Sequence, residues 1–552
     1  MRTTPGGSKR TRPTLIAVGF LAIGVSLAAQ GGVTFDRILH ADKEPQNWLS
    51  YSGTPLNQRY SGLAQITPAN VKNLQLQWIW QARSLEKFET TALAVNGVLY
   101  TVQAPNDVVA LDAETGRPYW TFAYSPAADA RTCCGRVNRG LAILGDTLYM
   151  GTIDAHLLAI DAKSGELLWN TTVAKSSERY SITMSPLIVK DKVIIGTAGG
   201  DGPIRGQIAA FDAKTGKELW RFFTIPGTGE PGNETWSGNS WMTGGAGVWN
   251  AGAYDPETNL TFFGTGNPAP DWDGRGRVGD NLYSDSVVAI DADTGKLKWH
   301  YQFTPHDELD YDSTQVPVLA DIQFRGRPRK AMLWANRNGL MYVLDRTTGE
   351  FLLGRPYVKV NWMDGFDAKG RPQRVEGKVP TKEGTLIQPH VHGATNWAPP
   401  SFSPRTGWFY VAHWENSATV VTEGLSPRPA GANPRQTTMG QVNLQTFFNN
   451  EDEAYGVVRA YDPQTLERKW EYRMSDITWG GVLTTASDLV FSGGKEGYFF
   501  ALDAKSGSLL WKAALGGQVN SGPMSYSVNG RQYVTVAAGS SLFAFALPGE
   551  TR

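Results

Sequence analysis

The sequence predicts an all-β fold, an eight-bladed β-propeller whose ring is closed by pairing the two ends of the chain. Three observations predict it: a strand–turn–strand pattern recurs along the chain, another hairpin precedes each copy, and the last blade lacks an outer strand that a segment near the N-terminus can supply. Repeats of roughly 40 to 50 residues built from short strands are typical of propeller blades. Pairing the chain ends would also remove exposed sheet edges.

The outer half of each blade is expected to be an eleven-residue unit that we call the W-motif. It reads as an apolar strand, a tight Asp-x-x-Thr/Ser-Gly turn and a second strand that ends in a large apolar residue, usually Trp. The seven copies are ALDAETGRPYW (110–120), AIDAKSGELLW (159–169), AFDAKTGKELW (210–220), AIDADTGKLKW (289–299), VLDRTTGEFLL (343–353), AYDPQTLERKW (460–470) and ALDAKSGSLLW (501–511).

The inner half of each blade is expected to be a second hairpin placed before each W-motif. Its second strand is plain in seven places: GVLYTV (97–102), DTLYMGT (146–152), KVIIGT (192–197), LTFFGTG (260–266), KAMLWAN (330–336), GWFYVAH (407–413) and DLVFSGG (488–494). An eighth, QYVTVAAG (532–539), is followed by LFAFAL, after which the chain has no outer strand. We expect LQLQWIW (74–80) to supply that strand.

Composition and the N-terminus narrow the class of protein. The chain has 552 residues and a formal net charge of zero, with no basic tract beyond the N-terminus, which argues against a nucleic-acid-binding function. Residues 1–30 combine a basic head, an apolar run from Leu15 to Leu27 and small residues, as in a secretory signal peptide; a membrane span needs roughly 20 apolar residues. We expect an exported protein, periplasmic in a Gram-negative host, with one propeller domain over residues 31–552 and no transmembrane segment in the mature chain.

Long interruptions of the repeat place the functional site on one face. We label the strands of a blade A to D from the axis outward and call the face on which strand A begins the top. Residues 221–248, 354–395 and 414–455 then fall in connections on the top face, and the last of them is expected to cover or rim the axis. The A strands are expected to begin near Glu89, Arg139, Thr183, Trp249, Asp310, Asn396, Trp479 and Ser521.

The stretch TPHDELDYD (304–312) holds four carboxylates. Asp310 and Asp312 alternate at the start of an apolar strand, so they are expected to share a face, where two ionised carboxylates repel unless a cation or a shared proton holds them. The other interpretation is a solvated strand end. Top-face loops add Asp201, Asn267 and Arg337, and the cluster of Asp201, Asn267, Asp310 and Asp312 would suit a hard cation better than zinc or copper.

Two further pairs of residues are of types that form disulfides or bind metal ions. Cys133 and Cys134 are the only cysteines, and in an oxidising compartment they can bond to each other or remain two thiols. His390 and His392 flank Val391, but no cysteine or third histidine lies near them in the sequence, so a metal pair is disfavoured.

Several motifs together resemble the pyrroloquinoline quinone (PQQ) alcohol dehydrogenases, the methanol dehydrogenase large subunit among them. They are the W-motif repeat, CCGRVNRG (133–140), GTGNPAPDW (264–272), TPHDELDYD and WGGVLTT (479–485), and the resemblance runs from the Trp48 region to Leu547. It implies an enzyme that oxidises a primary alcohol, or an aldehyde, with PQQ. The alternatives are a non-catalytic propeller scaffold of the cell envelope and a PQQ dehydrogenase for another substrate, such as a sugar.

The resemblance also implies residue roles. Trp249 would stack on one face of PQQ, and a disulfide between Cys133 and Cys134 would cover the other. Asp201, Asn267 and Asp310 match the metal ligands, although Asp201 stands where the family usually has a longer Glu. Asp310 matches the catalytic base, and Arg337 matches the basic residue beside the reactive carbonyl. The positions that match those holding the PQQ carboxylates and edges are Glu89, Arg139, Thr183, Ala198, Gly199, Gly200, Asn396 and Trp479.

The same resemblance bears on the ion and on the electron acceptor. Asp312, two positions after Asp310, resembles the lanthanide-dependent members, and three carboxylates balance a trivalent ion; we therefore expect one lanthanide(III) ion, with Ca²⁺ as the alternative. The sequence contains no C-x-x-C-H haem-attachment motif, so a separate soluble cytochrome c is the expected electron acceptor. A homodimer is one of the oligomeric states we consider.

Overall fold

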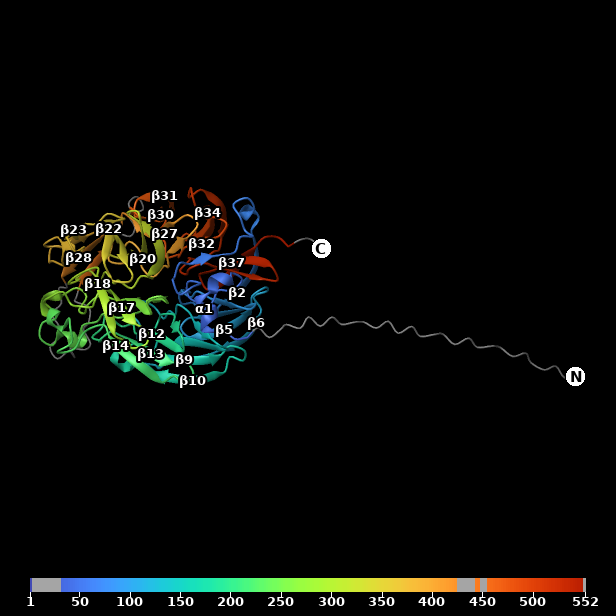
Figure 1. Ribbon diagram of the computed structural model, residues 1–552, viewed down its shortest axis with the longest axis horizontal. Helices are drawn as coiled ribbons and strands as arrows, with labels where there is room; N and C mark the ends of the chain where they lie inside the picture. Colours follow the sequence, from blue (N-terminus) through green and yellow to red (C-terminus); the bar gives the residue numbers. More distant parts are fainter. Residues whose placement is uncertain (2–30, 424–441, 447–453, 550–552) are drawn as a thin grey trace. The chain divides into compact units, whose positions relative to one another are not determined.

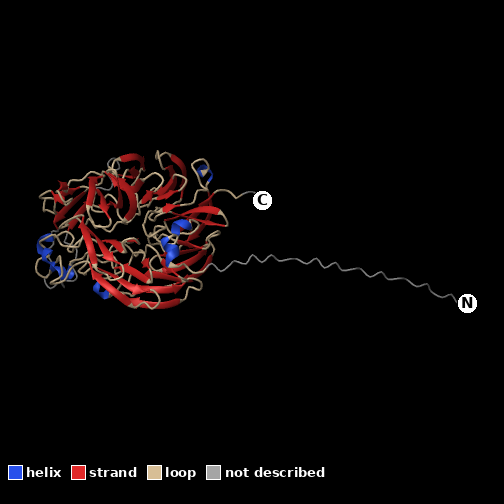
Figure 2. Cartoon of the chain, viewed as in Figure 1, coloured by secondary structure: helices blue, strands red, loops and turns tan. Residues whose placement is uncertain are grey.

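Strands make up nearly all the regular structure of the computed structural model (Figure 2). It describes Met1 and residues 31–423, 442–446 and 454–549. The predicted signal peptide falls on residues 2–30, which lie outside this description. Residues Gly32–Arg552 form one unit and Met1–Gly31 another. Within the described residues, no helix has the length and apolar character needed to cross a membrane.

The unit Gly32–Arg552 contains eight blades, each with four antiparallel strands, and β1 (Tyr60–Ser61) adds a fifth, parallel strand to blade 7; this confirms the predicted fold class. Blade 1 consists of β3 (Leu93–Val95), β4 (Val98–Gln103), β5 (Asp107–Asp112) and β6 (Pro118–Phe122), and blade 2 of β7 (Ala142–Leu144), β8 (Thr147–Gly151), β9 (His156–Asp161) and β10 (Leu167–Thr172). Blade 3 consists of β11 (Leu187–Val189), β12 (Lys192–Gly196), β13 (Gln207–Asp212) and β14 (Glu218–Phe223). Blade 4 consists of β15 (Ala253–Asp255), β16 (Leu260–Gly264), β17 (Ser286–Asp291) and β18 (Leu297–Gln302).

Blades 5 to 8 continue the same order, A to D. Blade 5 consists of β19 (Val318–Phe324), β20 (Arg327–Ala335), β21 (Leu340–Asp345) and β22 (Phe351–Pro356), and blade 6 of β26 (Ser401–Ser403), β27 (Trp408–Glu415), β30 (Tyr455–Tyr461) and β31 (Arg468–Arg473). Blade 7 consists of β32 (Leu483–Thr485), β33 (Leu489–Gly493), β34 (Tyr498–Asp503) and β35 (Leu509–Ala514). Blade 8 consists of β36 (Met524–Val528), β37 (Arg531–Ala538), β38 (Ser541–Ala546) and β2 (Gln75–Gln81).

The two ends of the propeller meet in blade 8, as predicted. Strand β2 pairs antiparallel with β38, with Leu76 opposite Phe545 and Trp80 opposite Leu542. In Figure 1 the blue β2 accordingly lies beside the red β37 of the same sheet. The outer strand of the last blade therefore comes from the start of the propeller sequence, and the ring has no open edge at this point.

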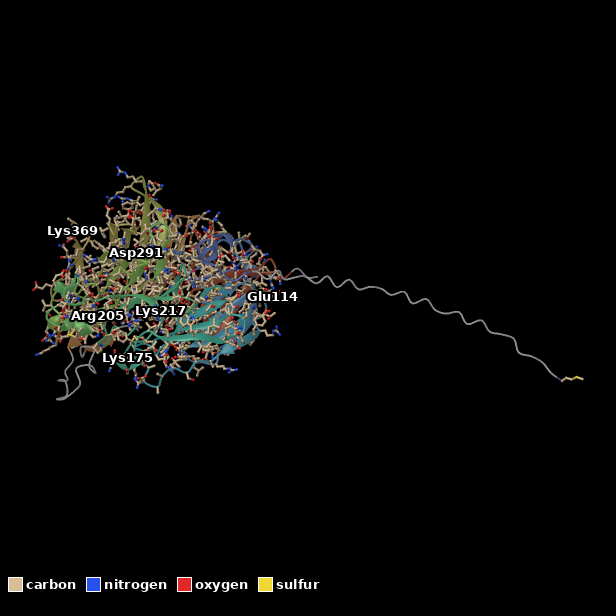
Figure 3. The ribbon with its side chains drawn as sticks, turned by 60° about the horizontal axis from the view of Figure 1, so that its bottom comes forward. Glu114, Lys175, Arg205, Lys217, Asp291 and Lys369 are labelled. Atoms are coloured by element: carbon tan, nitrogen blue, oxygen red, sulfur yellow. A yellow bond between two sulfur atoms is a disulfide. The ribbon has the colours of Figure 1, made fainter. Side chains whose placement is uncertain are left out.

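A Trp of the outer strand joins most blades to the next one. In blade 3, the Asp212 carboxylate accepts hydrogen bonds from the backbone and hydroxyl of Thr215 and closes the turn. Trp220 then donates its indole N–H to Ala292 O of blade 4 (3.1 Å), and its ring covers Gly295, where a Cβ would lie 2.6 Å from the ring. The same stacking on a turn glycine recurs for Trp78, Trp120, Trp169, Trp299 and Trp470. Three of the turns are marked in Figure 3 by Glu114, Lys217 and Asp291.

A segment before β2 connects the blades across the ring, and the sequence did not predict this role. It contains α1 (Phe35–Leu39), η1 (Ala41–Lys43) and β1 (Tyr60–Ser61), which pairs with β32 in parallel. Its buried Arg59 donates hydrogen bonds to Tyr51 O, Pro523 O and Thr91 Oγ1. Further bonds reach blades 1, 2, 4, 5, 6 and 8 through Ala94, Gly145, Gly252, Leu319, Phe402 and Ser527.

The interruptions of the repeat form small elements of their own. They include the hairpin β23 (Met363–Phe366) and β24 (Pro372–Arg374) and a sheet of β25 (Thr385–Ile387), β28 (Thr419–Glu423) and β29 (Val442–Thr446). Residues 424–441 and 447–453 of the third interruption lie outside the described residues, so its placement over the axis stays a prediction. The remaining short helices are η2 (Val71–Asn73), η3 (Ser176–Glu178), η4 (Asn233–Thr235), η5 (Ser240–Thr243) and η6 (Gly274–Gly276).

The predicted starts of the A strands were too early. These strands begin three to eight residues after the predicted positions; β19, for example, begins at Val318 and not near Asp310. One reason is that the loops leading into the A strands bond in part to neighbouring blades, although Thr90 Oγ1 still donates to Val102 O of its own B strand. Thr91 N donates to Arg139 O, and Arg139 N donates to Thr183 O. The predicted site residues near the A strands therefore lie on these loops, whereas Asp201, Asn267 and Arg337 lie on loops between strands B and C.

Candidate active site

A pocket lies where the loops leading into the A strands meet the loops between strands B and C. It encloses about 960 Å³, its open mouth included. Its lining comes from blades 1 to 7, as expected for a site on the propeller axis. The lining residues are Lys87, Glu89, Thr132, Cys133, Cys134, Gly135, Val137, Arg139, Ser181, Thr183, Ala198, Gly199, Gly200, Asp201, Trp249, Asp310, Asp312, Arg337, His392, Asn396, Trp397 and Trp479.

All the residues expected to bind the cofactor line this one pocket, as do three of the four expected metal ligands, Asp201, Asp310 and Asp312. The fourth, Asn267, lies just behind the wall and donates its backbone N–H to Asp312 Oδ1 (2.9 Å). Sequence reasoning missed several lining residues. Lys87 and Ser181 each precede a predicted residue by two positions, and Trp397 directly follows Asn396. Their position next to, or two residues from, a predicted site residue was the signal that could have identified them.

One wall of the pocket combines an aromatic ring and a guanidinium, and the lining also includes a disulfide near Asp201. Cys133 and Cys134 are bonded to each other, which confirms the expected pairing. The Cζ of Arg139 lies 4.9 Å from the ring centroid of Trp249, and Nη1 donates to Trp249 O and Thr183 Oγ1. Arg139 also forms a buried ion pair with Glu89 (2.7 Å). This wall can hold a flat, anionic ligand, because the ring offers a stacking surface and the guanidinium offers charge-assisted hydrogen bonds.

The glycines beside this wall bring backbone to the edge of the pocket. Gly199 has φ of +113°, and a Cβ there would lie 2.3 Å from Arg179 O. A Cβ on Gly200 would lie 2.9 Å from Gly247 N. Ala198 pairs with Ser181 in an isolated bridge that fixes the same segment. Larger residues at the two glycines would therefore displace the backbone that lines the pocket.

The other side of the pocket is acidic and is organised by one arginine. Arg337 Nη2 donates to Asp310 Oδ2 (2.8 Å), Nη1 donates to Asp312 Oδ2 (2.6 Å), and Nε donates to Val391 O (2.8 Å). The two carboxylates converge as expected, but for a different reason: both precede β19, and Asp310 has φ of +58°. They meet because one guanidinium fork holds both of them, and not because they alternate along a strand.

The ligand set also includes a buried amide. Gly266 leaves room for Asp312, since a Cβ there would lie 2.4 Å from Asp312 Oδ1. Asn267 is 1% exposed, and its Oδ1 has no hydrogen-bond partner among the described residues. Both oxygens of Asp312 already accept one hydrogen bond, and each keeps a lone pair, so ligation of an ion by Asp312 stays a prediction.

Burial and mutual repulsion shift the acidic groups. Burial, followed by the charge of Asp312, raises the pKa of Asp201 to about 6. Burial raises the pKa of Asp310 well above its usual value, although Arg337 opposes the shift, and burial with the surrounding carboxylates does the same to Asp271. Burial lowers the pKa of Arg337, but Asp310 and Asp312 raise it by more. If these carboxylates ionise together, their negative charge exceeds the positive charge of Arg337, and a bound cation would offset the burial and repulsion that raise their pKa values.

A third wall is aromatic. Trp397 stacks on Trp479 with centroids 4.4 Å apart, and Trp414 packs edge-on against Trp479 at 4.3 Å. His392 lines the pocket beside them, and its backbone N–H donates to His390 Nδ1 (2.9 Å). Burial lowers the pKa of His390 to about 2 and that of His392 to about 4. His390 thus accepts a hydrogen bond within its own loop.

The fold and the pocket define a propeller enzyme class that holds a planar anionic cofactor beside a cation. A family model described as "PQQ: Glucose/ethanol/alcohol dehydrogenase, beta-propeller domain" matches residues 48–361 and 453–534. The chain belongs to the family of PQQ-dependent alcohol dehydrogenases and is an enzyme of this type. Membership in this family sets aside the alternative of a non-catalytic scaffold.

Relatives and solved structures agree with this assignment. The chain is 36% identical to the quinoprotein alcohol dehydrogenase PedH of Pseudomonas putida, over 96% of this chain and 93% of that protein. It is 34% identical to a lanthanide-dependent methanol dehydrogenase of Methylacidiphilum fumariolicum, over 95% and 89%. The structure is similar to that of a quinohemoprotein alcohol dehydrogenase, ADHIIG, from Pseudomonas putida (TM-score 0.88, 35% identity, 95% and 84% covered) and to a europium-containing methanol dehydrogenase (TM-score 0.86, 31% identity, 93% and 100% covered).

The residues present fit the two cofactors that the family implies, PQQ and a metal ion. For an anionic quinone, the pocket offers the Trp249 ring and Arg139, whose Nε is buried without a hydrogen-bond partner among the described residues. For a hard cation, it offers the carboxylates of Asp310 and Asp312, and Asn267, whose backbone N–H donates to Asp312, has a buried Oδ1 without a hydrogen-bond partner among the described residues. All of the donors for the ion are oxygens, as Ca²⁺ and lanthanide ions prefer.

Proposed function

We propose that this chain is an exported quinoprotein that oxidises a primary alcohol, or an aldehyde, to its carbonyl product. The observation that carries the proposal is the fork of Arg337, which holds Asp310 and Asp312 in the same pocket as Trp249 and the Cys133–Cys134 disulfide. A base, an arginine and a stacking surface are thereby brought together in a water-restricted site.

Each side chain has a distinct part in the proposed reaction. PQQ, when bound, would supply the hydride acceptor, and the ion would supply Lewis acidity. Asp310 takes the proton of the substrate hydroxyl at a carboxylate oxygen. Arg337 keeps Asp310 in place through Oδ2 and favours its ionised form, which is the form that accepts a proton. Trp249 and the disulfide would hold the cofactor, with its carboxylates and edges against Glu89, Arg139, Thr183, Ala198, Gly199, Gly200, Asn396 and Trp479.

We propose a lanthanide(III) ion held by Asp201, Asn267, Asp310 and Asp312, with Ca²⁺ as the alternative. Three of these ligands, Asp201, Asp310 and Asp312, are carboxylates that act electrostatically on one another and on Arg337. A trivalent ion neutralises them, whereas a divalent ion leaves an excess. The short Asp201 side chain would limit the number of ligands that this residue supplies.

We also propose a cellular setting for the enzyme. Residues 1–30 support export to the periplasm, where the disulfide is stable. Because the sequence has no C-x-x-C-H motif, we propose that electrons pass to a soluble cytochrome c as a separate partner.

Reconstitution tests the proposal. Metal-free protein is supplied with PQQ and either La³⁺ or Ca²⁺, and bound quinone is measured by absorbance together with turnover of primary alcohols. We expect both ions to support PQQ binding and La³⁺ to give the higher turnover. Absence of bound quinone with either ion would contradict the enzyme assignment of this pocket. Equal or higher turnover with Ca²⁺, together with unchanged La³⁺ turnover in Asp312→Ala, would contradict the lanthanide assignment alone.

A further inference from the structure

Asn267 is the one expected metal ligand whose usefulness depends on the direction of a side-chain amide. An amide has an oxygen end that can bind a cation and a nitrogen end that repels it. Asn267 is almost fully buried, so its amide cannot exchange ends without breaking buried hydrogen bonds. The group that sets the direction of this amide therefore decides whether Asn267 can serve the ion.

Asp271 sets that direction. Its Oδ1 accepts a hydrogen bond from Asn267 Nδ2 at 2.8 Å, and Pro268 O accepts a weaker one from the same nitrogen at 3.3 Å. Both neighbours are oxygen acceptors, so the NH₂ end faces them and Oδ1 faces the other way. That oxygen is the buried atom with no partner among the described residues. Asp271 can accept this bond in either protonation state, so the orientation does not depend on its charge.

The loop that carries Asp271 is held firmly enough to serve as a support. Arg277 donates two hydrogen bonds to Pro270 O, from Nε at 3.2 Å and from Nη2 at 3.0 Å. Ala269 N donates to Gly244 O, and Asn267 O accepts from Ala246 N. Arg277 itself is fully buried. The loop is therefore tied to a buried cation and to the neighbouring insertion on both sides of Asn267.

We propose that Asp271 is a positioning residue of the ion site, which turns Asn267 Oδ1 toward the ion by accepting the Asn267 Nδ2 hydrogen bond. The inference rests on the proposed function, since it assumes that an ion binds among Asp201, Asn267, Asp310 and Asp312. It assigns Asp271 no contact with substrate or PQQ. Outer partners of metal ligands commonly change ion affinity by about 10- to 100-fold when they are removed.

A set of variants separates orientation from charge. Asp271→Ala removes the acceptor, Asp271→Asn removes the charge but can keep an acceptor oxygen, and Asn267→Ala removes the ligand. Asp273→Asn is the matched control, because Asp273 lies in the same loop but pairs with Arg275 on the surface. The dissociation constant of Tb³⁺ is measured by tryptophan-sensitised luminescence of the full mature chain loaded with PQQ. Thermal unfolding of every variant is recorded in parallel.

We expect Asp271→Ala to weaken Tb³⁺ binding by about 10- to 100-fold, and Asp271→Asn and the Asp273→Asn control to weaken it much less. If Asp271 acts through Asn267, the double variant Asn267→Ala/Asp271→Ala binds no more weakly than Asn267→Ala alone. Equal affinity in wild type and Asp271→Ala, or additive losses in the double variant, would overturn the inference while leaving the ion site intact. If the wild-type protein itself fails to bind Tb³⁺, the proposed ion site fails, and the inference fails with it.

Discussion

Arg337→Lys is the substitution that most directly tests the organisation of the active site. It retains the positive charge but replaces a planar fork by a single nitrogen. In the structure the fork makes three bonds, to Asp310 Oδ2, Asp312 Oδ2 and Val391 O. One ammonium on a flexible chain cannot occupy the positions of three guanidinium nitrogens, so at least one carboxylate loses its partner.

The size of the effect follows from these bonds. A hydrogen bond to a charged group contributes about 1.5–3 kcal/mol, so losing two of them gives about 3–6 kcal/mol. At about 1.4 kcal/mol per factor of ten, this corresponds to a loss of ~10²–10⁴ in kcat/KM if all of it enters the transition state. The bonds also hold Asp310 before the reaction, so only part of the energy affects the rate. We expect a loss of about 10².

The pH profile should change as well. Arg337 opposes the burial-driven rise in the pKa of Asp310, so loss of its contact raises that pKa further. Asp310 must be ionised to accept a proton, and activity is lost as the pH falls through its pKa. The acidic limb of kcat/KM should therefore move to higher pH in Arg337→Lys.

The assay is steady-state oxidation of a primary alcohol with an artificial electron acceptor, in protein whose PQQ content is verified by absorbance. Arg346→Lys is the matched control, because Arg346 is a buried arginine of the same blade that pairs with Asp255 and Asp321 away from the pocket. We expect the control to lose stability but to keep its kcat/KM. If Arg337→Lys stays within about five-fold of wild type with PQQ bound and its pH profile unmoved, the assigned role of the fork is wrong.

Three other outcomes are expected. Asp310→Asn should lower turnover by at least ~10²-fold with fold and PQQ absorbance retained, because an amide cannot take the hydroxyl proton; near-normal turnover would assign the base elsewhere. Trp220→Ala should lower the free energy of unfolding by about 3–5 kcal/mol in denaturant titrations. The ring of Trp511 covers no turn glycine, so Trp511→Ala should lower it by less. Equal losses would contradict the proposed inter-blade role of the W-motif. His390 is neutral in the folded protein, where its pKa is about 2, but titrates near its ordinary value when unfolded, so the free energy of unfolding falls as the pH drops below about 6.5. His390→Asn can still accept the His392 N–H and should therefore lose less stability between pH 7 and pH 5. Identical pH profiles for the two proteins would contradict this.

The sequence alone determined the propeller, because the information that specifies a blade is local. The turn of the W-motif closes on itself: the Asp212 carboxylate bonds to Thr215, three residues later, and the next glycine adopts a left-handed conformation. The period of the repeat then fixes the number of blades, and the unpaired last strand fixes how the ring closes. Many of the pocket residues were likewise found in advance, because they lie just before the A strands or between strands B and C and match the motifs of a known family.

Only the tertiary structure decided how these residues act on one another. Alternation along a strand was the wrong reason for joining Asp310 to Asp312, since they lie on a loop and are held by Arg337, which follows them by 27 and 25 residues. The direction of the Asn267 amide depends on a bond to Asp271 within an irregular loop. In loops, side-chain direction follows no fixed period, and a contact between distant segments depends on the packing of whole blades. The sequence could therefore name the members of the site, but their hydrogen bonds and charge balance came from the folded chain.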